Sequence, residues 1–240
     1  MTRKFTLPIL FVLCGLIALA ADHIPAAKGD IVITPIAHAS VQLEYDGKVI
    51  QVDPWSTGDY SHALPADVIL ITGAEADHLD PKAIQKIRKS GTAIVIPAAG
   101  ADKVPDGIVI ANGEKRTVDG IPVEAIASYD LLPGDPFHPK GRGNGYVILL
   151  GGKRIYFSGV TECVPEVQAL RNIDVAFIVM NSPNGRMTAS ATAACVEAFK
   201  PAIVYPYHYR TGKVAELQGL LAGKPYEVRT GDWYPPAAPK

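Results

Sequence analysis

Three side chains that could bind a metal ion follow short apolar runs in this sequence. Asp77 and His78 come a few residues after the run at 68–72, in the stretch ILITGAEADHLDP. His208 follows a second apolar run at 203–205. Carboxylate and imidazole groups are common zinc ligands, and a catalytic zinc typically has three protein ligands and one open position. Asp77, His78 and His208 are therefore the predicted metal ligands.

Two further side chains are candidates for proton transfer. Glu75 lies two residues before Asp77, and His138 lies in a Pro- and Gly-rich loop at 129–145. Either could act as a general base, or as an acid that protonates a leaving group, in a hydrolytic reaction. Glu75 and the Asp77-His78 pair also have simpler interpretations. Glu75 could be a solvated surface acid, and an Asp-His pair before a helix is often a cap beside a surface residue.

Strands and helices that would position these side chains are predicted from apolar periodicity and turn residues. The predicted strands are 31–36, 41–45, 48–52, 68–72, 93–96, 108–111, 115–118, 122–126, 146–150, 154–157, 175–180 and 203–205. Helices are predicted at 81–89, 165–171, 189–199 and 214–221. The candidate residues all lie beyond strand ends. Because ligands collect at the carboxyl ends of strands in open α/β sheets, we expect these residues to converge.

Four stretches carry a resemblance to a known family. They are AHASVQLEYDGKVIQVDPW, DVILITGAEADHLDP, FHPKGRGNGYVILLGGKRIYFSGVTECVPE and PAIVYPYHY, and they span most of the chain from His38 to His208. In this order they resemble the metallo-β-lactamase superfamily, in particular its branch of metal-dependent hydrolases. The resemblance implies an α/β fold, the four-layer αββα sandwich, in a single domain over residues 21–240.

The first metal site of the resembled family is incomplete here. The family pattern at 72–80 is T-H-x-H-x-D-H-L-D, and its first two histidines fall on Gly73 and Glu75. The bridging aspartate of a later G-D-T motif falls on Val160, while His138 matches a histidine that closes the first site. Two dications repel strongly without a bridging carboxylate, so a dinuclear centre is not expected.

The second metal site is complete, because Asp77, His78 and His208 match all three of its terminal ligands. The expected cofactor is thus one Zn²⁺ ion at most, or none. One function that remains open is a mononuclear zinc hydrolase of a small ester, amide, lactone or phosphoester. The other is a non-catalytic, metal-free relative that binds a small molecule or a protein. A formal charge of −1 and the lack of a basic block argue against nucleic acid as a partner, and the oligomeric state is not indicated.

Residues 1–20 have the features of a secretory signal peptide. Arg3 and Lys4 precede an apolar run that contains Ala18-Leu19-Ala20, a small-x-small cleavage pattern. The run is short for a membrane span, although an uncleaved anchor is the alternative. We expect cleavage near Ala20 and a periplasmic or secreted protein without a membrane segment.

Cys163 and Cys195 would remain after this cleavage. An exported protein meets an oxidising compartment, so the two residues could form a disulfide. A chain of this length builds a large core and does not need a cross-link. They are therefore predicted to be two separate buried thiols.

Overall fold

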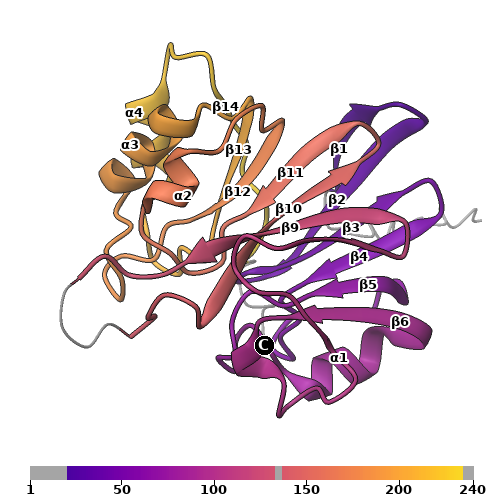
Figure 1. The fold of residues 1–240 in the computed structure, drawn as a ribbon. Coiled ribbons are helices and arrows are strands. Elements are labelled where there is room, and N and C mark those ends of the chain that lie inside the picture. The colour runs from indigo at the N-terminus through magenta and orange to yellow at the C-terminus, as the bar shows by residue number, and fades with distance from the viewer. Residues whose placement is uncertain (1–20, 133–136, 235–240) are drawn as a thin grey trace, which may run out of the picture.

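A computed structural model describes residues 21–132 and 137–234, which build two seven-stranded β-sheets (Figure 1). The predicted signal peptide lies outside these residues. The first sheet contains β1 (Asp22–Ala26), β2 (Gly29–Ala37), β3 (Ser40–Tyr45), β4 (Lys48–Val52), β5 (Ala66–Leu70), β6 (Arg88–Ile96) and β7 (Ile108–Val109), in chain order. The second sheet contains β8 (Lys115–Val118), β9 (Ile121–Ser128), β10 (Gly143–Leu150), β11 (Lys153–Phe157), β12 (Val175–Val179), β13 (Ile203–Tyr207) and β14 (Glu227–Val228), again in chain order.

The two halves of the chain repeat one topology. In the first sheet, β1 to β4 pair antiparallel and β4 to β7 pair parallel. In the second, β8 to β11 pair antiparallel and β11 to β14 pair parallel. In this repeat β5 corresponds to β12, and the β2–β3 turn corresponds to the loop between β9 and β10. The repeat is not visible in the sequence itself.

Helices cover the outer faces of both sheets (Figure 1). α1 (Pro81–Ile87) packs on the first sheet, where Ile69, Ile84 and Ile94 belong to one buried cluster. α2 (Pro165–Gln168), α3 (Ala189–Phe199) and α4 (Val214–Leu221) lie outside the second sheet. The main core lies between the sheets and includes Leu43 and Phe157. The αββα sandwich is thereby confirmed.

Tight turns set the register of the antiparallel strands. Asp46-Gly47 joins β3 to β4 with φ of 48° and 76°, and Asp119-Gly120 joins β8 to β9 with φ of 47° and 79°. Both turns need left-handed backbone at two consecutive residues, which an Asp-Gly pair tolerates. Strand β1, in contrast, was not predicted. Among the described residues, no helix is long and apolar enough to cross a membrane.

The prediction of two free thiols is wrong. Cys163 and Cys195 form a disulfide, with their Cα atoms 5.5 Å apart. Cys163 lies in the segment between β11 and α2, and Cys195 is a buried residue of α3. The packing of α2 against α3 brings the two cysteines together, and the sequence spacing of 32 residues gave no sign of it.

Candidate metal centre

Asp77 lies in the loop that joins β5 to α1. The backbone N–H groups of His78 and Leu79 donate to the carbonyl of Glu75 at 3.0 and 2.8 Å, so the loop turns tightly around Asp77. Asp80 then caps α1 by accepting a hydrogen bond from the backbone N–H two residues further on, at 2.9 Å. These bonds hold the Asp77 side chain, which is 23% exposed, beyond the carboxyl end of β5.

His38 and His208 come from different sheets and are joined through the backbone. His38 lies in the turn between β2 and β3, and His208 is the first residue after β13. The N–H of His208 donates to the carbonyl of His38 at 2.9 Å. Both residues have left-handed backbone, with φ of 57° and 59°. Such conformations are uncommon outside glycine and are often found at functional sites.

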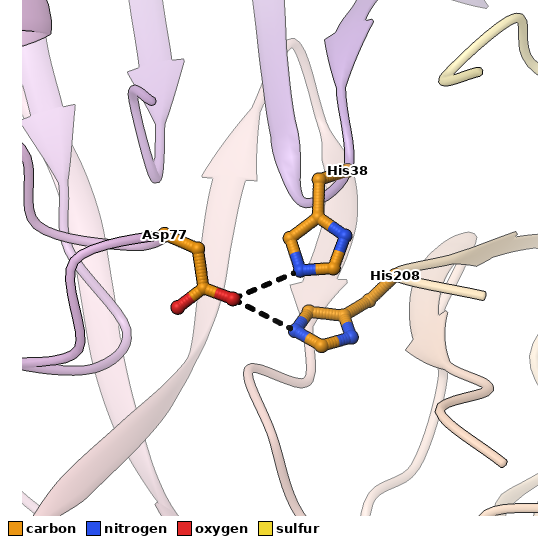
Figure 2. A group of neighbouring side chains, drawn as sticks. All are labelled: His38, Asp77 and His208. Carbon is orange, nitrogen blue, oxygen red and sulfur yellow. Dashed lines mark hydrogen bonds and ion pairs between the residues drawn. The ribbon is translucent and has the colours of Figure 1, made fainter. Parts of the chain in front are cut away.

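The three side chains converge on one carboxylate oxygen (Figure 2). The Nε2 atom of His38 lies 3.1 Å from Asp77 Oδ2, and the Nε2 atom of His208 lies 4.0 Å from the same oxygen. The ring centroids of the two histidines are 3.7 Å apart. One nitrogen or oxygen atom from each of the three residues lies within 4.8 Å of the other two.

We call His38, Asp77 and His208 the His-Asp-His cluster. Two residues outside this cluster contact it. The Nη2 atom of Arg210 lies 3.2 Å from Asp77 Oδ2. The hydroxyl of Tyr234, near the carboxyl end of the described chain, lies 2.6 Å from His38 Nδ1. A hydrogen bond to one ring nitrogen fixes the orientation of an imidazole, so Tyr234 aims His38 Nε2 at Asp77.

Charge and burial together favour the protonation states that metal ligands need. Burial lowers the pKa of His38, although its hydrogen bond to Asp77 opposes this shift. Burial and the neighbouring charges of His78 and His38 lower the pKa of His208 well below its ordinary value. Burial raises the pKa of Asp77, but the His38 hydrogen bond and the nearby histidine charges outweigh it, so the pKa lies below its usual range. Neutral imidazoles and an ionised carboxylate are the forms that bind a metal.

The His-Asp-His cluster therefore fits one divalent cation. Two imidazole nitrogens and one carboxylate oxygen suit zinc, and the same donors accept other first-row metals. The buried Nδ1 atom of His208 has no hydrogen-bond partner among the described residues. An unpartnered polar atom at a buried position is unusual in a folded protein, and a bound ion or water molecule is one way to satisfy it.

His78 lies beside the cluster and not within it. Its Nδ1 atom is 2.8 Å from Asp53 Oδ2, and both side chains are almost completely buried. Burial lowers the pKa of His78, but the charge and hydrogen bond of Asp53 more than offset this effect, so the pKa is raised. The His78 ring stacks on His208 with centroids 5.2 Å apart. That Asp77, His78 and His208 are the metal ligands stays a prediction, with His38 as the alternative third ligand.

The predicted acid–base residues, Glu75 and His138, line one small hollow next to His78. Its volume is about 10 Å³, near the smallest that holds one water molecule. The hollow is lined by Thr72, Gly73, Glu75, His78, Ser128, His138, Arg142, Gly143 and Val160. Gly73, Glu75 and Val160 are the positions where the first metal site departs from the family pattern. The lining of the hollow thus lacks the two histidines and the bridging aspartate that would hold a first ion.

Each of the two acid–base candidates has a charged partner. Arg142 Nε lies 3.1 Å from Glu75 Oε1. Asp130 Oδ2 lies 3.3 Å from His138 Nδ1 and accepts the His138 backbone N–H at 3.1 Å. These contacts orient both side chains, but they do not test a catalytic role.

His38, Arg210 and Tyr234 were not among the predicted site residues. The side chain of His38 bonds to Asp77, one of the predicted ligands. The available signal was its place in the short segment between two predicted strands, where a buried polar residue is unusual. Tyr234 lies close to the Pro-rich end of the chain, and Arg210 directly follows the HY pair at 208–209. No local pattern distinguished either of them.

Comparisons with known proteins place this architecture in a family. A sequence profile of the beta-lactamase superfamily domain matches residues 32–208. The chain belongs to this family. It is 29% identical over 225 residues to a metal-dependent hydrolase of Symbiobacterium thermophilum, an alignment that covers 83% of this chain and 97% of the relative. It is 30% identical over 190 residues to a metal-dependent hydrolase of Thermococcus kodakarensis, with 73% and 83% covered.

Solved structures agree with this assignment. A crystal structure of a predicted metal-dependent hydrolase from Parabacteroides distasonis is 40% identical, with a TM-score of 0.86, and covers 90% of this chain and 100% of that one. A metallo hydrolase from Ignicoccus hospitalis is 22% identical, with a TM-score of 0.70 and coverage of 83% and 94%. At 22% identity, the similarity to the Ignicoccus hospitalis protein shows a shared metallo-β-lactamase fold and says nothing about function.

Proposed function

We propose that this protein is a metal-dependent hydrolase that works with a single metal ion, most simply Zn²⁺. The proposal rests on one observation: the Nε2 atoms of His38 and His208 both face the Oδ2 atom of Asp77 (Figure 2). Relatives named metal-dependent hydrolases support the reaction type. A second ion is not part of the proposal, because Val160 stands where the family has its bridging aspartate, and Gly73 and Glu75 stand where it has two histidines.

When bound, the ion would supply an acidified water, with a pKa near ~7, and would polarise the bond to be hydrolysed. Asp77 and His208 would hold it, with His38 or His78 as the third ligand. The substrate would be a small ester, amide, lactone or phosphoester. Among these, nothing about the pocket selects one class.

Glu75 and His138 are the proposed proton-transfer residues. Both face the hollow that adjoins His78, and each is oriented by one partner, Arg142 or Asp130. In this arrangement one residue would accept a proton from the attacking water, and the other would deliver a proton to the leaving group.

A metal-free binding module is the second candidate function, and one feature favours it. Arginines already pair with both acids of the site, Arg142 with Glu75 and Arg210 with Asp77. Such pairs neutralise the carboxylates without an ion. In this second candidate the pocket would bind a small molecule or a protein and catalyse nothing.

Export to the periplasm or outside the cell is also proposed. It rests on the signal-like residues 1–20 and is supported by the disulfide between Cys163 and Cys195. Disulfides persist in oxidising compartments and are rare in the cytosol.

Hydrolysis of a panel of chromogenic esters, amides, lactones and phosphoesters by the purified protein would test the reaction. We expect turnover of at least one class, loss of turnover after chelation and recovery with Zn²⁺. Glu75→Gln should lose turnover while its zinc affinity stays close to that of the wild type. Turnover that resists chelation, or no turnover with zinc bound, would contradict the proposed hydrolase.

A further inference from the structure

Arg210 places a positive charge directly on the candidate metal-binding carboxylate. Its Nη2 atom is 3.2 Å from Asp77 Oδ2, the oxygen that His38 and His208 also face. The Arg210 side chain is 46% exposed, so it reaches the cluster from the solvent side.

The turn after β13 brings Arg210 back toward Asp77. His208 and Arg210 both have left-handed backbone, with φ of 59° and 45°. The N–H of Gly212 donates to the carbonyl of Tyr209 and closes the turn. A Cβ atom at Gly212 would lie 2.9 Å from that same carbonyl oxygen, so the close approach requires glycine. The chain therefore directs the His208 and Arg210 side chains to one oxygen from two positions that are only two residues apart.

A metal ion and Arg210 would share that oxygen. A zinc–carboxylate bond is about 2.0–2.2 Å long, so an ion on Asp77 Oδ2 would lie within a few ångströms of the guanidinium. Two cations at such a distance repel each other. Because the side chain is half-exposed, Arg210 can move into solvent when an ion arrives, but the ion must then displace an existing ion pair.

We propose that Arg210 is a built-in competitor for the metal site, which neutralises Asp77 in the metal-free protein and lowers the affinity of the site for divalent cations. This inference rests on the proposed single-metal function and deepens it. Arg210 would then be the residue that sets how tightly the ion binds.

Calorimetric titration of chelator-treated protein with Zn²⁺ tests this role without any activity measurement. The variants are Arg210→Gln and Arg210→Asn, the second because Asn tolerates left-handed backbone well. An adjacent arginine changes the proton affinity of an aspartate by roughly 10- to 1,000-fold, and a dication experiences the same field with twice the charge. We expect both variants to bind zinc at least about tenfold more tightly than the wild type.

Arg88→Gln is the matched control. Arg88 Nη2 bonds to Asp106 Oδ2 at 2.7 Å, with its side chain 39% exposed, so the substitution removes the same charge from a similar pair. Arg88 pairs with Ala66 at the start of β5, whereas the His-Asp-His cluster lies beyond the end of that strand. The zinc affinity of the Arg88→Gln variant should therefore equal that of the wild type.

The possible results separate this inference from the proposed function. Equal zinc binding by wild type and both Arg210 variants would overturn the inference and leave the single-metal site intact. Zinc binding by the variants alone would support the inference but contradict the proposed metal-dependent function of the wild type. If neither the wild type nor the Arg210 variants bind zinc, both ideas are wrong.

Discussion

His38 and His78 present two ways to complete a metal site with Asp77 and His208. The side chain of His38 points at Asp77 and is held by Tyr234, whereas His78 is paired with the buried Asp53. Asp77 and His208 could be chosen from sequence because each lies beyond the end of a predicted strand and matches a ligand position of the resembled family. His38 could not be chosen in this way. Its approach to Asp77 depends on the left-handed turn after β2 and on the backbone hydrogen bond from His208, which is 170 residues away in the sequence.

The two histidines make different contributions to zinc binding if the observed geometry is kept in the metal-bound protein. We expect His38→Ala to weaken zinc affinity by about 100-fold or more, because a two-ligand site holds zinc poorly. His78→Ala should have the smaller effect, of about tenfold, through lost support of His208. Titration calorimetry compares the two variants directly. The reverse order would establish Asp77, His78 and His208 as the ligands.

At the scale of elements, most strands and helices could be predicted because their apolar periodicity is regular. The Asp-Gly pairs between predicted strands mark two of the hairpins, because these residues tolerate the left-handed backbone of a tight turn. Loops and cross-links were not predicted, because they depend on packing between distant elements. The disulfide illustrates this difference, since α2 must first pack against α3 before Cys163 can reach Cys195.

Reduction of this disulfide should measurably destabilise the protein. A bridge that closes a loop of this size contributes about 3–4 kcal/mol in the chain-entropy account. For a protein of this length that corresponds to a fall of roughly 10 °C in Tm. Thiol counting in denaturant should find no free thiol before reduction and two afterwards.

The double variant Cys163→Ala with Cys195→Ala serves as the control for reductant. Its Tm should be low from the start and should not change when dithiothreitol is added. A wild-type Tm that does not respond to complete reduction would contradict the stabilising role of the bridge.

At the scale of the whole molecule, the site lies where the two repeated halves meet. The first half supplies His38 and Asp77, and the second supplies His208 and Arg210. Resemblance to a family predicted the sandwich, but not how the two halves divide the site between them. The repeat itself was invisible because the halves share topology and not sequence.

The first described strand lies just beyond the proposed cleavage site. β1 begins at Asp22, whose carboxylate accepts hydrogen bonds from Tyr205 and from Arg229, the latter at 3.1 Å. Cleavage after Ala20 would therefore leave this anchored strand intact. Mass spectrometry of protein expressed in its native host should show a chain that starts near Ala21. A chain that keeps Met1 and stays in the cytoplasm would refute export.

The number of zinc ions bound by the mature protein tests the central claim most directly. Calorimetric titration of chelator-treated wild type should reach saturation at one equivalent of Zn²⁺, because only the second metal site of the family is complete. His208→Ala should abolish this binding, since the cluster then loses its only ligand from the second sheet. No uptake by the wild type at micromolar zinc, a second equivalent, or unchanged binding by His208→Ala would contradict a single metal ion held between the two sheets.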